Sequence, residues 1–347
     1  MKNRVVKTSF AFLLMAFGFG AVPASSQSPK SHPVVSEEGL PENLLITGNK
    51  REHTVSFFDL DTAVEVVRKE TGRAPHEIAI SPDGLQAVVV SYREQGFLGN
   101  TLHVFDTLTG KQTSTIDIGE NLAPHGIKWI GDSDHVIATT EASQTVVRVN
   151  VKTGQVVASI GTGAPGSHMV ALSPDNATAY VANIQGGSVS VIDLESSSLK
   201  QVVPMGQGTE GISVSPDGKY LWVGNNGSRN VLKVDASSFE IMQTIPTKGI
   251  PIRVEISPNG KWVAVSEADL HMVSIFSADS GELVGQTDLT LSGGQVPVTI
   301  LWAPDSESYF VAATASNTVH EIEASDWTAG KVFKAGDGSD GLALVIR

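Results

Sequence analysis

The sequence predicts an all-β fold, because one turn motif recurs along most of the chain and short apolar strands flank each copy. The motif is Ser81-Pro82-Asp83-Gly84, and related copies begin at Ser173, Ser215, Ser257 and Ala303. A degenerate copy, Ile130-Gly131-Asp132-Ser133, fills the gap after the first. A spacing of roughly 42 to 49 residues, with several short strands in each period, is typical of the blades of a β-propeller.

Each period is expected to hold four antiparallel strands. The first precedes the turn, as in residues 76–80, and the second follows it, as in residues 220–225. The third ends in an aspartate, as in residues 189–193, and the fourth follows a Thr-Gly or Ser-Gly turn, as in residues 155–160. These segments are strand-length and rich in β-branched residues.

Counting the periods predicts seven blades. Six complete four-strand units lie between His76 and Asp340, and two fragments remain. Residues 43–70 supply three strands and residues 341–346 supply a fourth, so the two ends of the chain are expected to close the seventh blade together. Closure removes free sheet edges, and it must provide stability without disulfides because the chain has no cysteine.

The N-terminal residues have the pattern of an export signal. Lys2, Arg4 and Lys7 precede an apolar run that is too short to span a bilayer, and small residues follow it. We therefore predict a signal peptide over residues 1–24, a disordered leader over 25–42 and a β-propeller over 43–347. The mature protein is expected to be periplasmic or secreted, with no membrane span.

The net charge of the chain argues against nucleic-acid partners. The formal net charge is −13, and loss of the three basic residues of the signal would make it −16. So acidic a chain is a poor candidate for non-specific nucleic-acid binding. We expect no nucleic-acid partner, and the closed sheets favour a monomer.

Two segments resemble a known repeat. Tyr180-Val181-Ala182-Asn183 precedes a strand ending at Asp193, and Leu221-Trp222-Val223-Gly224-Asn225 precedes one ending at Asp235. Both look like the YVTN-type β-propeller repeat, and the chain more loosely resembles secreted propellers of quinoprotein systems and surface layers. The resemblance implies the fold and a location outside the cytoplasm, but no single activity.

Aligning the periods on the turn proline reveals a polar ring. The residue six positions before the proline is expected to lie at the mouth of the central channel in each blade. On one arc of the ring these residues are polar: His76, His125, His168, Glu210 and Asp340. The remaining two are Ile252 and Val298.

Three imidazoles and two carboxylates suit a divalent metal ion such as Zn, Cu, Mn or Fe. The same set could supply a general acid and base, or the histidines could simply hold the strand ends. The sequence leaves these alternatives open. Side chains near the same mouth that we predict to contact a ligand are Arg253, Arg51, Arg93, Asn183, Asn225 and Glu267.

Two functions follow from this ring. The first is an exported propeller that binds a metal ion, a small ligand or a partner protein at the channel mouth. The second is a metal-dependent lyase or hydrolase. The arrangement resembles that of seven-bladed propeller lyases, and this resemblance implies action on a carboxylate-bearing substrate by β-elimination or by lactone or ester cleavage, with Arg253 holding the carboxylate. The sequence does not decide whether the protein is an enzyme.

Overall fold

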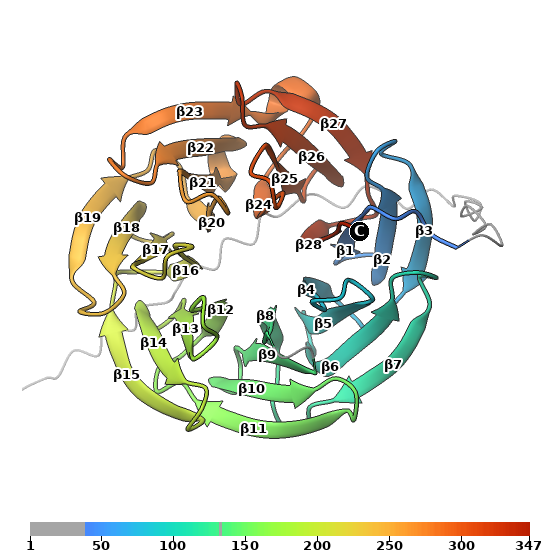
Figure 1. Ribbon diagram of the computed structural model, residues 1–347, viewed down its shortest axis with the longest axis horizontal. Coiled ribbons are helices and arrows are strands. Elements are labelled where there is room, and N and C mark those ends of the chain that lie inside the picture. The colour runs from blue at the N-terminus through green and yellow to red at the C-terminus, as the bar shows by residue number, and fades with distance from the viewer. Residues whose placement is uncertain (1–38, 132–133) are drawn as a thin grey trace, which may run out of the picture. The chain divides into compact units, whose positions relative to one another are not determined.

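A computed structural model describes residues 39–131 and 134–347, which form a ring of seven four-stranded antiparallel sheets (Figure 1). This confirms the predicted seven-bladed β-propeller. The predicted signal peptide and most of the predicted leader lie outside the described residues. Within the described part of the chain, no helix is long and apolar enough to cross a membrane.

Every blade has the same strand order from the channel outward. The innermost strands are β4 (Pro75–Ile80), β8 (Pro124–Trp129), β12 (Ser167–Leu172), β16 (Thr209–Val214), β20 (Pro251–Ile256), β24 (Pro297–Trp302) and β28 (Ser339–Val345). The second strands are β5 (Gln86–Glu94), β9 (His135–Thr140), β13 (Thr178–Asn183), β17 (Tyr220–Asn225), β21 (Trp262–Glu267), β25 (Ser308–Ala313) and β1 (Leu44–Asn49).

The third strands are β6 (Phe97–Asp106), β10 (Thr145–Asn150), β14 (Ser188–Asp193), β18 (Asn230–Asp235), β22 (Met272–Ser277), β26 (Thr318–Glu323) and β2 (Thr54–Asp59). The outermost strands are β7 (Gln112–Asp117), β11 (Gln155–Gly161), β15 (Ser198–Pro204), β19 (Ile241–Pro246), β23 (Leu283–Asp288), β27 (Ala329–Lys334) and β3 (Glu65–Glu70). Two short 3₁₀ helices, η1 (Ala268–Leu270) and η2 (Leu289–Ser292), follow β21 and β23.

The two ends of the described chain close the ring as predicted. Strand β28 pairs with β1 in an antiparallel register, with Leu344 opposite Leu45. The seventh sheet therefore has the order β28-β1-β2-β3, and its inner strand comes from the C-terminal end.

The recurrent turn is held by its own side chains. The Ser81 hydroxyl bonds to the Asp83 carboxylate at 2.5 Å and accepts the Gln86 backbone N–H at 2.9 Å. Gly84 has a φ of 72°, a conformation that glycine adopts without a steric cost. The motif is thus a self-capped turn between the first and second strands, which explains its recurrence at the same place in successive blades.

The apolar core lies between blades rather than at the centre of the ring. One cluster, for example, packs Val90 and Val104 of the β4–β7 blade against Ile127 and Val136 of the next blade. Similar clusters join the other neighbouring blades in the described part of the chain. Because apolar residues fill these contacts, the channel is left to the inner strands and their polar side chains.

Each inner strand has a β-bulge near its start. In β4, Pro75 pairs with Ser91 and Ile78 pairs with Val89, so the register shifts at His76 and Glu77. The same irregularity occurs in the other inner strands. A bulge changes the direction of side chains, and here it brings two consecutive residues of one strand into the same polar cluster.

Candidate functional site at the channel mouth

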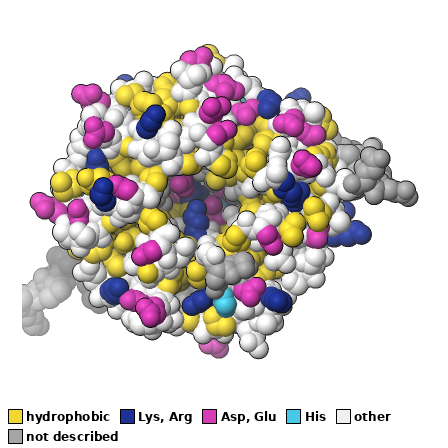
Figure 2. Space-filling model, viewed as in Figure 1, with side chains coloured by type: hydrophobic (Ala, Val, Ile, Leu, Met, Phe, Trp, Pro, Cys, Tyr) yellow, Lys and Arg dark blue, Asp and Glu magenta, His cyan; other side chains and the backbone are white. Residues whose placement is uncertain are grey.

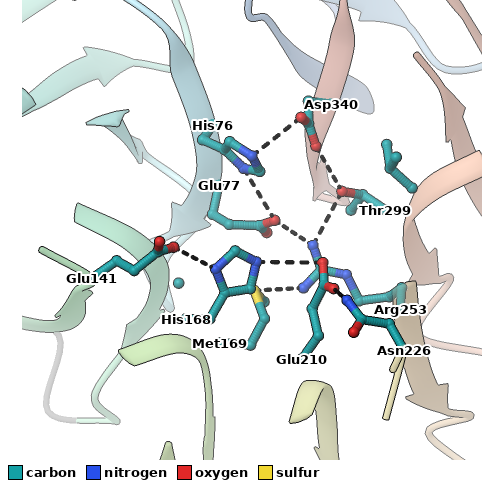
Figure 3. Close-up of polar contacts among 12 residues, drawn as sticks. His76, Glu77, Glu141, His168, Met169, Glu210, Asn226, Arg253, Thr299 and Asp340 are labelled. Carbon is teal, nitrogen blue, oxygen red and sulfur yellow. Dashed lines mark hydrogen bonds and ion pairs between the residues drawn. The ribbon is translucent and has the colours of Figure 1, made fainter. Parts of the chain in front are cut away.

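The polar residues predicted to form a ring do come together. His76, His125, His168, Glu210 and Asp340, here called the mouth ring, are the second residues of five inner strands. The ring centroids of His76 and His125 are 4.1 Å apart, and those of His125 and His168 are 3.6 Å apart. Figure 3 shows Asp340 beside His76 and Glu210 beside His168.

His168 lies between two carboxylates. Its Nδ1 is 2.7 Å from Glu141 and its Nε2 is 3.4 Å from Glu210. Burial opposes its protonation, but the bonds to Glu141 and Glu210 outweigh burial and raise the pKa of His168 to about 9. Burial likewise opposes ionisation of Glu141, but His168, Tyr92 and Arg93 lower the pKa of Glu141 to about 2. His168 is therefore a cation at neutral pH, with both nitrogens occupied.

His76 and His125, unlike His168, have lowered pKa values. Burial lowers the pKa of His76 despite Asp340, and burial together with the nearby His168 and His76 lowers the pKa of His125 well below its usual value. Both imidazoles are therefore neutral at pH 7. The Nδ1 atoms of both rings are buried and have no hydrogen-bond partner among the described residues.

The closer carboxylate, that of Asp340, favours a proton on Nε2 of His76. The Nε2 of His76 is 3.2 Å from the Asp340 carboxylate, whereas Nδ1 is 3.6 Å from Glu77. A proton on Nε2 satisfies Asp340 and leaves the Nδ1 lone pair directed toward Glu77. A carboxylate behind an imidazole is the usual support for a histidine that binds a metal ion.

Glu77 is part of the site although the sequence reasoning missed it. The side chain lies one layer deeper in the channel and pairs with Arg253. Burial would raise the pKa of Glu77, but Arg253 and His76 lower it well below the usual range, so the carboxylate is ionised. One ligand atom each from His76, Glu77 and His125 lie within 4.8 Å of one another, and all three residues are buried.

Glu77 belongs to a second layer of the channel, the crossing layer, formed by the third residues of the inner strands. Its members are Glu77, Gly126, Met169, Gly211, Arg253, Thr299 and Gly341. Arg253 Nη2 donates to Glu77 and, at 3.2 Å, to Thr299, and Nη1 lies 2.7 Å from the sulfur of Met169. These contacts span the channel directly beneath the mouth ring (Figure 3).

Strand pairing reveals which residues support the mouth ring, and three of them, Tyr92, Glu141 and Asn226, were not predicted. The residues opposite the first positions of the inner strands include Asn183, Asn225 and Glu267. The next residue along the chain faces the mouth instead: Tyr92 bonds to Glu141 at 2.6 Å, Glu141 bonds to His168, Asn226 bonds to Glu210, and Lys50 lies 3.7 Å from Asp340.

The residues predicted to bind a ligand are mostly occupied within the protein. Asn183 donates to Ser190 at 2.8 Å, Asn225 donates to Asn230 at 2.9 Å, and Glu267 accepts from Ser274 at 2.5 Å. These bonds fasten the second strand to the third, which favours a structural role.

The three predicted arginines differ in position. Arg253 is only 4 % exposed and pairs with Glu77. Arg93 is 3.0 Å from Glu141 and lies over the ring of Tyr92, at the mouth. Arg51 pairs with Asp337 at 2.8 Å on the surface. Only Arg253 and Arg93 thus contact the polar cluster, and ligand binding by all three stays a prediction.

The sequence matches the family of the cytochrome D1 heme domain over residues 131–339, which is more than half of the chain. The chain belongs to the cytochrome D1 heme domain family. No curated protein matches it. The resemblance to YVTN-type repeats stays a prediction.

Two solved structures share the fold of this family member. A chain of hydrazine synthase from Kuenenia stuttgartiensis is 19 % identical with a TM-score of 0.70, over 88 % of this chain and 99 % of that one. A functionally unknown protein from Desulfotomaculum acetoxidans is 17 % identical with a TM-score of 0.72, over 88 % and 99 %. At such identities the likeness concerns the fold alone.

The family name raises the question of whether the channel suits a haem. A haem needs an axial ligand beside a slot that accepts the macrocycle. His125 is packed against His76 and His168, and the Tyr92 ring stands edge-on to it at 4.6 Å. Beyond the crossing layer lies a cavity of about 360 Å³, and among the described residues that line it there is no histidine. The residues present in the channel therefore do not fit a haem.

Proposed function

We propose that this protein is an exported propeller that binds one divalent transition-metal ion at its channel mouth. His76 and His125 would bind through their Nδ1 atoms, and Glu77 would bind through its carboxylate. The observation that carries the proposal is the pair of buried, unpartnered imidazole nitrogens beside a buried, ionised carboxylate. A buried polar atom without a partner costs free energy, and a bound cation would remove that cost.

The chemistry of the three groups supports a metal ion of the kind the sequence predicted. Two neutral imidazoles and one carboxylate are a ligand set used for zinc and for non-haem iron, and such sites leave coordination positions open. The carboxylate of Glu77 has lone pairs for both Arg253 and a metal. His168, Glu210 and Asp340, predicted as direct ligands, would instead support the site from outside, because their polar atoms already have partners.

No observation favours the lyase or hydrolase. Arg253, the predicted anchor for a substrate carboxylate, is buried and paired with Glu77. Tyr92 does not supply the general base that a lyase would need, because burial and Glu141 raise the pKa of Tyr92 far above its usual value. We therefore propose binding rather than turnover as the role of the mouth.

Metal titration of the full chain tests this proposal. The protein is prepared without an affinity histidine tag, stripped with a chelator and titrated calorimetrically with Zn²⁺, Mn²⁺, Cu²⁺ and anaerobic Fe²⁺. We expect one ion to bind per chain in the wild type and in His320→Gln, which removes a buried histidine outside the mouth. His125→Ala and Glu77→Gln should abolish binding. Absence of binding in the wild type, or unchanged binding in both mouth variants, would leave the cluster with a structural role only.

A further inference from the structure

A cavity lies at the other end of the channel. The cavity beyond the crossing layer is bounded there by Glu77 and Arg253, and its walls are the later residues of the inner strands. Figure 2, which looks along the channel, shows a face hollowed at its centre with basic and acidic side chains inside. The cavity volume of about 360 Å³ is at the lower end of the range for small-molecule pockets.

Two opposite charges face this cavity without pairing. Lys128 and Glu255 occupy the fifth positions of β8 and β20, on opposite sides of the ring (Figure 1), and both line the cavity. Within the described residues, neither side chain forms a hydrogen bond or an ion pair. The corresponding residues of the other inner strands are small or uncharged: Ala79, Ala171, Ser213, Leu301 and Ala343.

Lys128 is exposed and Glu255 is half-buried, so each charge can be reached by water or by a ligand, which would supply the partner that the protein does not. Burial raises the pKa of Glu255 even though Lys128 and Arg253 oppose the rise, so this carboxylate gains from a cationic partner. Arg253 lines the same cavity, is 4 % exposed, and its Nε–H has no partner among the described residues. Cationic donors and a carboxylate are therefore available on separate parts of the wall.

The rest of the wall is apolar. Trp129 and Trp302 lie at equivalent ends of β8 and β24, and aliphatic side chains from neighbouring strands join them: Ile80, Ile127, Ile300, Leu342 and Leu344. A ligand that matches this wall has a carboxylate, an ammonium group and an apolar body. We infer that the cavity binds a free α-amino acid with an apolar side chain, its carboxylate directed to Lys128 and its ammonium group to Glu255. This inference does not depend on the metal site.

Calorimetric titration of the full chain with L-leucine and L-phenylalanine tests the inference. We expect saturable binding of at least one of them. 4-Methylpentanoate, which lacks the ammonium group, and 3-methylbutylamine, which lacks the carboxylate, should bind at least tenfold more weakly. Lys128→Met and Glu255→Gln should each weaken amino-acid binding at least tenfold, whereas Lys152→Met, on an exposed turn, should not change it.

A double variant in which the two charges are exchanged distinguishes loss of ligand recognition from misfolding. Lys128→Glu combined with Glu255→Lys keeps both charges in the cavity, so it should restore binding that either single exchange removes. The inference is overturned if neither amino acid binds at millimolar concentration, if 4-methylpentanoate binds as well as L-leucine, or if Lys128→Met and Glu255→Gln bind like the wild type.

Discussion

The tautomer of His76 depends on which of two carboxylates lies closer to a ring nitrogen, and Asp340 is closer than Glu77. Asp340 lies 3.2 Å from Nε2 and also accepts from Thr299 at 3.3 Å. Asp340→Asn keeps the shape of the side chain but removes the acceptor charge that favours a proton on Nε2. We expect the affinity for the metal ion to fall roughly 10- to 100-fold, measured by competition with a chelator. An unchanged affinity would show that Asp340 does not orient His76.

The Arg253–Glu77 pair should matter for stability as well as for position. Both side chains are buried, at 5 % and 10 % exposure. Arg253→Met would leave the Glu77 charge buried without its main partner, so the free energy of unfolding in urea should fall by about 3–5 kcal/mol. Arg51→Met breaks a pair of similar chemistry on the surface and should cost less than about 1 kcal/mol.

The double variant Arg253→Met with Glu77→Gln provides the internal check. It should be more stable than Arg253→Met alone, because no unpaired charge is left in the channel. Equal losses in the single and double variants would contradict the account of a charge pair and would point to packing of the arginine side chain instead.

At the scale of strands, the glycines of the crossing layer allow the inner strands to approach. A Cβ on Gly126 would lie 2.8 Å from the carbonyl oxygen of His168 and 2.9 Å from the backbone nitrogen of Val170, in the neighbouring blade. Gly126→Ala should therefore push β8 and β12 apart and lower stability by about 1–3 kcal/mol. Thermal unfolding would measure the loss.

Gly161→Ala is the matched control. Gly161 ends the outer strand β11, and a Cβ there would meet nothing within 4 Å. We expect no measurable loss of stability from this change. If both variants unfold at the wild-type temperature, the close approach of the inner strands does not contribute to stability.

His320 links strand β26 to the helix η2, and its titration should make the stability of the protein depend on pH. Its ring bonds to Ser292 at 3.0 Å and to Thr318 at 2.8 Å, and burial lowers the pKa of His320 to about 4. Between this value and the usual pKa of about 6.5, the unfolded chain binds the proton that the folded protein excludes. Stability should therefore fall as the pH falls through this window, by at most about 3 kcal/mol.

Comparing the wild type with His320→Gln separates the contribution of His320 to the pH dependence of stability from the contributions of other titrating groups. Glutamine keeps polar atoms near Ser292 and Thr318 but does not titrate. Urea unfolding at several pH values should show a flatter dependence between pH 6.5 and 4 in the variant than in the wild type. Parallel curves would mean that His320 is not held neutral by its surroundings.

At the scale of the whole molecule, the repeat made the ring predictable. The turn motif marks the junction of first and second strands in successive blades, so aligning its copies predicted both the seven blades and the mouth ring. Glu77 escaped this reasoning because the bulge in β4 brings two consecutive residues into the cluster. Regular strand alternation would direct one of them away.

A residue that supports the mouth ring was predicted one position too early along the chain. Asn225 was predicted to face a ligand, but its side chain bonds within the sheet, while the next residue, Asn226, reaches Glu210. Such an offset depends on the pairing register, which sequence spacing leaves undetermined. The cavity between Lys128 and Glu255 was missed because its walls come from six inner strands that are distant in sequence.

Anomalous X-ray diffraction from metal-loaded crystals of the full chain would show whether His76, Glu77 and His125 bind a metal ion. Data collected on both sides of the absorption edge of the bound metal locate the ion without assumptions about its ligands. We expect one peak per chain, about 2.0–2.2 Å from Nδ1 of His76, from Nδ1 of His125 and from a carboxylate oxygen of Glu77. A peak outside the channel mouth, or no peak in crystals soaked with saturating metal, would contradict the proposed metal site.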